Sequence, residues 1–293
     1  MKATVWGCRG SLAAPGADTV QFGGNTSCVA LELEDGTRVV LDAGTGIRLL
    51  GLELAAAARR PLHVFLTHLH VDHIEGLGFF APLWDEDQEL HLWGPPSPVA
   101  SLEERISRYL SPPLFPVQVS EVPATVHFHD LPDEGFELGS AQVQAQPVTH
   151  RGPTVGFRFE EEGSSLAYIP DHEPYLGVLR GEVEPEWLSG FALAERVGIL
   201  LHDAQYSESE YPRHRGFGHS SVAHAVAFAQ VAEAERLILF HHDPSHGDAE
   251  LRELEARAGE LWGRSGRSPE LAFEGMELVA GRSLLGDRLA ARH

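Results

Sequence analysis

One segment constrains this sequence more than any other. Residues 67–73 are Thr-His-Leu-His-Val-Asp-His, which places three imidazoles and one carboxylate within a single short stretch. Residues 62–66 before it are apolar and follow a proline, which predicts a buried strand. Residues 74–77 after it are typical of the start of a helix. The polar side chains therefore lie where a strand ends, and a loop there can direct them towards one point.

The spacing within this segment predicts a metal site. His68 and His70 are two positions apart, so they can point the same way from an extended backbone. Asp72 and His73 follow where the chain turns, so they can face a second point nearby. Imidazole nitrogen and carboxylate oxygen are ligands that zinc accepts, and a pair of metal ions would suit this set. The alternative is a polar loop in which some of the 17 histidines of the chain meet by chance.

The composition limits the class of protein. The chain has 293 residues, enough for one large α/β domain, and its two cysteines, Cys8 and Cys28, do not make a disulfide framework. No apolar run is long enough to span a membrane and the N-terminus lacks a secretory pattern, so we expect a cytoplasmic protein. The formal net charge of −21 argues against general nucleic-acid binding. Bound metal cations would reverse the field locally and admit a small anionic substrate.

Residues 67–73 resemble the signature of the metallo-β-lactamase fold. Segments 6–11 and 23–28 are similar to one branch of that fold, the phosphodiesterases related to ribonuclease Z and to phosphoribosyl cyclic phosphodiesterase. The resemblance implies an α/β fold, a four-layer αββα sandwich of two mixed β-sheets flanked by helices. Since the sequence shows no linker, repeat or low-complexity segment, we expect a single metallo-β-lactamase-like domain over residues 1–293.

The resemblance also implies how two metal ions are held. His150, at a predicted strand end, corresponds to the third imidazole of the first ion, and Asp171, at another, to the carboxylate that bridges both ions. The last ligand follows a buried strand at His241, although the adjacent His242 leaves that position open. Asp42 resembles an aspartate that supports the metal loop by hydrogen bonding. The implied ligands of the two divalent ions, zinc with manganese or iron as alternatives, are His68, His70, Asp72, His73, His150, Asp171 and His241.

Two later segments imply catalytic roles. Residues 202–205 and 218–221 are similar to ribonuclease Z segments in which an acidic residue holds a histidine beside the scissile phosphate. Carried over, His219 is the general acid, Asp203 orients it, and Asp72 steers the proton of the attacking water. The alternative for His219 is an ordinary histidine at a helix end.

The resemblance to the family is weakest over residues 81–135. A strand is expected over 89–93 and a helix over 99–110. His127 and His129 alternate on another predicted strand with a spacing that suits a metal, but an exposed strand face is the favoured interpretation.

The predicted reaction is phosphodiester hydrolysis by a hydroxide that bridges two metal ions. Only residues 151–170 separate His150 from Asp171, too few for the tRNA-binding arm that ribonuclease Z carries there. Together with the net charge, this favours a small cyclic or acyclic phosphodiester and argues against bulk nucleic acid and membrane as partners. Related enzymes often form homodimers. The alternatives are a thioester, lactone or β-lactam hydrolase of the same fold, a non-catalytic metal-binding module, and a di-iron oxidoreductase, which ordinarily has a flavin domain.

Overall fold

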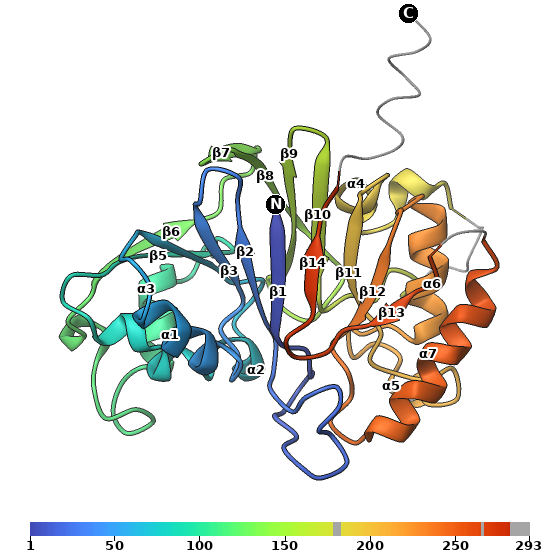
Figure 1. The fold of residues 1–293 in the computed structure, drawn as a ribbon, viewed down its shortest axis with the longest axis horizontal. Coiled ribbons are helices and arrows are strands. Elements are labelled where there is room, and N and C mark those ends of the chain that lie inside the picture. Colours follow the sequence, from blue (N-terminus) through green and yellow to red (C-terminus); the bar gives the residue numbers. More distant parts are fainter. Residues whose placement is uncertain (178–182, 265–266, 282–293) are drawn as a thin grey trace, which may run out of the picture.

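Two β-sheets lie face to face in this protein, and helices cover their outer sides (Figure 1). The computed structural model describes residues 1–177, 183–264 and 267–281. The expected four-layer αββα sandwich is confirmed. The extent of the single domain stays a prediction, since its last residues lie outside the described part.

The strands divide equally between the sheets. The first sheet contains β1 (Lys2–Gly7), β2 (Cys28–Glu32), β3 (Arg38–Leu41), β4 (Leu62–Phe65), β5 (Glu89–Gly94), β6 (Thr125–Asp130) and β14 (Glu277–Val279). The second contains β7 (Phe136–Leu138), β8 (Ala141–Pro147), β9 (Val155–Glu161), β10 (Ser164–Ile169), β11 (Ile199–Asp203), β12 (Leu237–Phe240) and β13 (Glu270–Leu271). The α-helices are α1 (Ile47–Ala55), α2 (Val71–Ile74), α3 (Leu102–Tyr109), α4 (Phe191–Ala194), α5 (Tyr211–His214), α6 (Val222–Val231) and α7 (Asp248–Trp262).

Strand order explains why the polar strand ends meet. The first sheet has the order β14-β1-β2-β3-β4-β5-β6 and the second has the order β13-β12-β11-β10-β9-β8-β7. Strands β3 to β6 are parallel to one another, and so are β10 to β13, while the other pairs are antiparallel. Both sheets are therefore mixed. The carboxyl ends of parallel strands share one edge of a sheet, which is where α/β proteins usually bind ligands.

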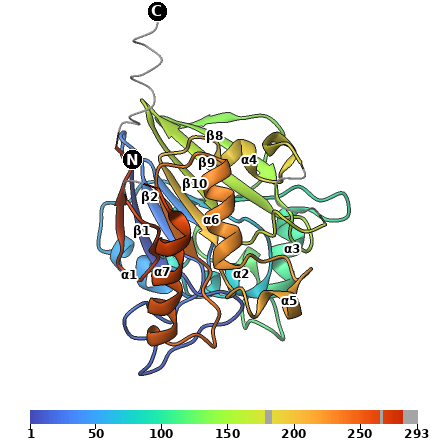
Figure 2. The same ribbon diagram turned by 90° about the vertical axis from the view of Figure 1, so that its right-hand side faces the viewer.

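The core lies between the sheets. Aromatic side chains from both sheets meet there, with Phe65 packed edge-on against Phe157 and Phe159, and Tyr168 against Phe240. Further apolar layers lie under α1 and α3 on one side and under α6 and α7 on the other (Figures 1 and 2). Helix α6 is apolar almost all round because its sheet and α7 both bury it.

Serine caps set the start of two helices, and one of these starts differs from the sequence-based expectation. Helix α3 begins at Leu102 because Ser101 and Glu104 form a reciprocal capping box, so residues 99–101 stay outside it. Helix α6 begins at Val222 because the Ser221 hydroxyl accepts a hydrogen bond from the His224 N–H, 3.2 Å away. Among the described residues, no helix has both the length and the apolar character needed to cross a membrane.

Candidate dinuclear metal centre

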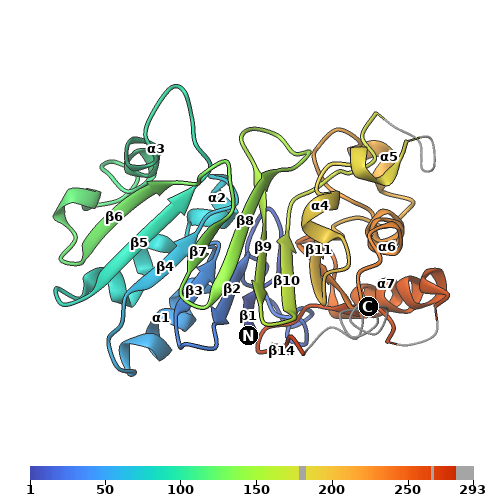
Figure 3. The ribbon, with the colours of Figure 1, turned by 90° about the horizontal axis from the view of Figure 1, so that it is seen from above.

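Loops at one edge of the two sheets carry the predicted ligands. His68 and His70 follow β4, and α2 begins directly afterwards with Asp72 and His73 on its first turn. Asp171 lies two residues after the end of β10, and His241 comes directly after β12. His150 lies in the loop after β8. In Figure 3, β8 and β10 lie near the middle of the molecule and β4 lies to their left. All seven predicted ligands are therefore brought together from both sheets.

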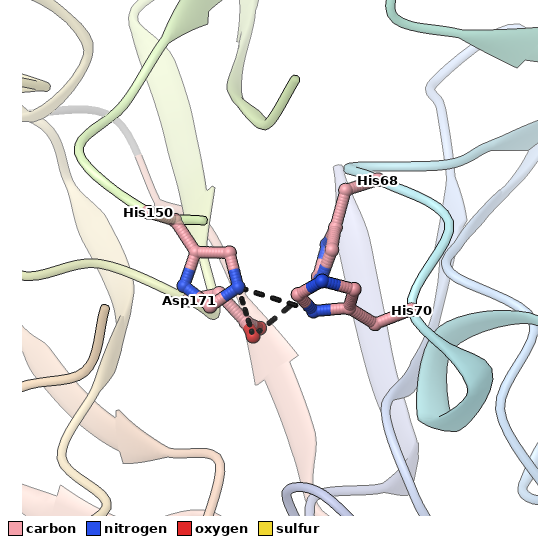
Figure 4. Close-up of side chains that lie close together, drawn as sticks. All are labelled: His68, His70, His150 and Asp171. Atoms are coloured by element: carbon pink, nitrogen blue, oxygen red, sulfur yellow. Dashed lines mark hydrogen bonds and ion pairs between the residues drawn. The ribbon is translucent and has the colours of Figure 1, made fainter. Parts of the chain in front are cut away.

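Four of these side chains form a first group. Nε2 of His68 and Nε2 of His150 each lie 3.6 Å from Oδ2 of Asp171. Nδ1 of His70 lies 3.2 Å from Nε2 of His150. Figure 4 shows the four side chains pointing towards one another, and one donor atom of each lies within 4.8 Å of the others.

The second group shares Asp171 with the first. Its other carboxylate oxygen, Oδ1, lies 3.0 Å from Nε2 of His73 and 3.3 Å from Nε2 of His241. Oδ2 of Asp72 lies 3.4 Å and 3.3 Å from the same two nitrogens. The two oxygens of one carboxylate thus face two separate sets of donors, which is the arrangement a bridging ligand needs.

The chemistry of the donors fits two divalent cations. Nε2 of His68 is buried, points at the shared carboxylate and has no hydrogen-bond partner among the described residues. Burial and neighbouring imidazoles hold the pKa of His68 well below its usual range, so the ring is neutral. Burial alone would raise the pKa of Asp171, but His241, His73 and His68 outweigh it and the pKa falls well below its usual range. Neutral imidazole beside ionised carboxylate is what a divalent transition metal binds.

The Asp42 carboxylate supports the histidine loop by hydrogen bonding, as expected. Its fully buried carboxylate lies 2.8 Å from Nδ1 of His73 and accepts hydrogen bonds from the Thr67 N–H at 2.8 Å and the Tyr168 hydroxyl at 3.0 Å. The hydrogen bond from Nδ1 of His73 leaves Nε2 free to face the second group. Asp42 thereby fixes the tautomer and orientation of a metal-facing ring.

The structure gives His241 and His242 different contacts. His241 faces the second group, whereas Nε2 of His242 donates to the Ala272 carbonyl, 2.8 Å away on the other side of the loop. Burial lowers the pKa of His242 to about 3, so this ring is a neutral structural donor. His241 has a backbone φ of +63°, and this turn lets adjacent side chains point in different directions.

His219 lies beside both groups and is paired with Asp203. Nδ1 of His219 is 2.8 Å from Oδ2 of Asp203, and its ring stacks on His241 with 4.9 Å between centroids. Burial alone would lower the pKa of His219, but the Asp203 carboxylate outweighs it and raises the pKa to about 9. The imidazole is therefore protonated at neutral pH and directed at the centre.

Glu173 is a residue that sequence analysis missed. Its fully buried carboxylate accepts hydrogen bonds from the Gly216 N–H at 2.9 Å, the Gly218 N–H at 2.9 Å and the Tyr211 hydroxyl at 2.7 Å. The Gly218 carbonyl in turn accepts from Nδ1 of His150, 2.8 Å away. Glu173 therefore positions the loop that carries His219. An acidic residue two positions after a predicted ligand was the only signal of it in the sequence.

A cavity of about 200 Å³ opens beside His219. Ser11, Arg151, Tyr206 and Phe217 line it together with His219. The Arg151 side chain donates to the Gly216 carbonyl at 3.0 Å and lies over the Phe217 ring at 5.8 Å. A larger cavity of about 370 Å³ is lined by no predicted catalytic or metal-ligating residue, whereas His219 lines the smaller one, so chemistry is expected in the smaller one.

Comparison with known proteins identifies the family. Residues 37–242 match the model of the Beta-lactamase superfamily domain. This chain belongs to that superfamily. Ribonuclease Z of Streptococcus pyogenes serotype M1 is 25% identical over 288 residues, which cover 81% of this chain and 90% of that protein. The family confirms the expected class, a metal-dependent hydrolase.

Two solved structures share the fold. Human tRNase Z, short form, has a TM-score of 0.66 at 22% identity, covering 96% of this chain and all of that one. Zinc-bound PqqB from Methylobacterium extorquens has a TM-score of 0.66 at 20% identity, covering 95% of this chain and 100% of that one. The two mixed sheets with outer helices are thus the metallo-β-lactamase fold.

The expectation of a small substrate and no nucleic-acid partner is wrong. Relatives similar over most of the chain are named Ribonuclease Z, and a nucleic acid is the substrate that this name states. The expectation rested on the short segment 151–170 and on the net charge of −21, which sums over the whole surface. The field at a site depends on nearby groups, and here Arg151, protonated His219 and any bound cations are positive.

Proposed function

We propose that this protein hydrolyses phosphodiester bonds, including those of RNA, at a centre of two divalent metal ions. The observation that carries the proposal is the position of Asp171, whose two oxygens face two different sets of donors. We assign His68, His70 and His150 to one ion, Asp72, His73 and His241 to the other, and Asp171 to both. Such ions generate hydroxide near neutral pH and offset the charge of a phosphate when bound.

The chain itself supplies the groups that act on the substrate. Burial alone would raise the pKa of Asp72, but His73 and His241 lower it far below its usual range, so this carboxylate stays ionised. Its Oδ2 also accepts the Ser11 N–H at 2.7 Å, which fixes its orientation. Asp72 thus serves to orient the attacking water through a hydrogen bond, because a carboxylate with so low a pKa is a weak base.

His219 donates a proton to the leaving group. Its protonated ring faces the cavity beside the centre, where a phosphodiester would place its leaving oxygen. Donation of this proton neutralises the leaving alkoxide, and Asp203 holds the imidazole in place during the transfer. Arg151 adds a positive charge at the cavity wall for an anionic substrate.

Leaving-group dependence tests these assignments. The substrates are a nitrophenyl phosphodiester, an RNA with an extended 3′ end, a thioester and a β-lactam. His219→Ala should slow RNA cleavage by roughly 10²-fold or more, and nitrophenyl cleavage by much less, because nitrophenolate leaves without a proton. His214→Ala, at the end of α5, is the control. Equal losses on both diesters would reject His219 as the acid, and turnover of thioester or β-lactam alone would reject the proposed function.

A further inference from the structure

A second cluster of histidines lies within the first sheet. His63, His91 and His127 occupy aligned positions on the parallel strands β4, β5 and β6. Their imidazoles are stacked in a row, with centroids 4.7 Å apart between His63 and His91 and 4.9 Å apart between His91 and His127. None of these residues contributes to the metal centre described above.

Glu89 completes a set of three donors at one end of this row. Its Oε1 lies 3.2 Å from Nε2 of His91 and 3.4 Å from Nε2 of His127. In a tetrahedral zinc site with bonds of about 2.0–2.1 Å, neighbouring ligand atoms are about 3.3–3.4 Å apart. Both distances from Glu89 thus match the spacing of such a site, and the two imidazole donors lie within 4.8 Å of each other.

A neighbouring histidine supports the donor state of His91. Nδ1 of His91 lies 2.9 Å from Nε2 of His129, which follows His127 by two residues on β6. A hydrogen bond donated from Nδ1 leaves Nε2 of His91 as the unprotonated atom that faces Glu89. Burial lowers the pKa of His91 and of His129, so both rings are neutral at neutral pH.

The cluster is accessible from solvent. Strands β5 and β6 lie at one end of the molecule in Figures 1 and 3, while β7, the edge strand of the second sheet, lies nearer the middle. The Glu89 and His127 side chains are 49% and 44% exposed. An ion can therefore enter directly, and a solvent water can fill the fourth corner.

We propose that Glu89, His91 and His127 bind one further divalent transition-metal ion, of the zinc class, separate from the hydrolytic centre. The two imidazole rings lie 23° from parallel, so each must turn about its Cβ–Cγ bond to direct its Nε2 lone pair at the ion. His63 lies at the far end of the row and is not a ligand.

Metal counting on the whole protein tests the proposal. The protein and its variants are dialysed against excess zinc and then against zinc-free buffer, and bound zinc is measured by mass spectrometry. His127→Gln and Glu89→Gln should each carry one zinc ion fewer per chain than the wild type. His63→Gln, a histidine in the same row that supplies no ligand, should match the wild type.

Cobalt gives a second readout that does not depend on hydrolysis. The visible absorption of tetrahedral cobalt(II) should fall in His127→Gln, while phosphodiester hydrolysis stays at the wild-type rate. Equal zinc content and equal cobalt spectra in wild type, His127→Gln and Glu89→Gln would overturn the proposal, leaving the cluster as a stack of histidines paired with a glutamate. The difference of one ion stands whether or not the hydrolytic assignment is correct.

Discussion

Nδ1 of His219 lies 2.8 Å from the carboxylate of Asp203, and this pair links the end of β11 to the loop before α6. The backbone N–H groups of His172, Gln205 and Ser220 also donate to the same carboxylate, at 3.0, 3.0 and 3.2 Å. Asp203 therefore has a fixed position, and His219 is oriented by a rigid partner.

The first prediction concerns the pH dependence of this pair. Burial lowers the pKa of His219, but Asp203 outweighs burial and raises the pKa to about 9 when no cation is bound. Activity that needs the proton of His219 is therefore lost on the alkaline side. Asp203→Asn removes the charge, and the alkaline limb of the pH–rate profile should move to lower pH. Bound cations lower the pKa in both proteins, so the difference between the two profiles is the measurement. Superimposed alkaline limbs would show that Asp203 does not control the proton.

The second prediction concerns Glu173. Glu173→Gln keeps the shape of the side chain but replaces one acceptor oxygen by an NH₂ group facing the Gly216 and Gly218 N–H groups. Hydrogen bonds to a charged group contribute about 1.5–3 kcal/mol, so the loop should loosen and the free energy of unfolding should fall by about 2 kcal/mol. Hydrogen exchange of residues 211–219 should accelerate while zinc content is unchanged. Unaltered exchange would remove the positioning role.

The third prediction concerns Gly218, which has a φ of +97°. A Cβ there would lie 2.4 Å from Nδ1 of His150, so Gly218→Ala should displace this ring and weaken zinc binding by about tenfold or more. Gly216→Ala is the matched control, because Gly216 also has a positive φ, +85°, but a Cβ there meets no atom within 4 Å. Competition with a chromophoric chelator measures both affinities, and equal values would refute a steric effect on His150.

These examples show what local sequence could predict. The segment 67–73 carries four donors within one strand-to-helix turn, so its spacing alone indicated the centre. The choice between His241 and His242 needed the backbone φ of +63°, which the sequence does not display. Glu173 and Tyr168 act through contacts between loops and strands far apart in the chain, and no local pattern marks such contacts.

Arg9 is another residue whose role depends on contacts between segments far apart in the chain. No local sequence pattern indicates the surroundings of Arg9, and the residue is fully buried. It donates to the carbonyl groups of Gly23, Asp243 and His246 at 2.8, 3.1 and 2.7 Å. Arg9 therefore joins the N-terminal glycine-rich loop to the loop that follows His241, a role that only the tertiary structure reveals.

The fourth prediction concerns the support beneath the histidine loop. Asp42→Asn leaves the Nδ1–H of His73 without its charged partner, and the affinity for zinc should fall by about 10–100-fold. Tyr168→Phe removes one of the hydrogen bonds to the same carboxylate and should cost about 1 kcal/mol of stability with little change in zinc affinity. Thermal unfolding and zinc titration separate the two effects. Equal zinc affinity in Asp42→Asn and the wild type would contradict the account.

The most direct test of the central claim is phosphodiester hydrolysis by metal-stripped protein, before and after zinc is restored. We predict that stripping abolishes hydrolysis, that zinc restores it, and that His68→Ala stays inactive at every zinc concentration because one ion is lost. Circular dichroism confirms that this variant is folded. Full hydrolysis by the stripped protein, or by His68→Ala, would contradict the assignment of a dinuclear hydrolytic centre to these residues.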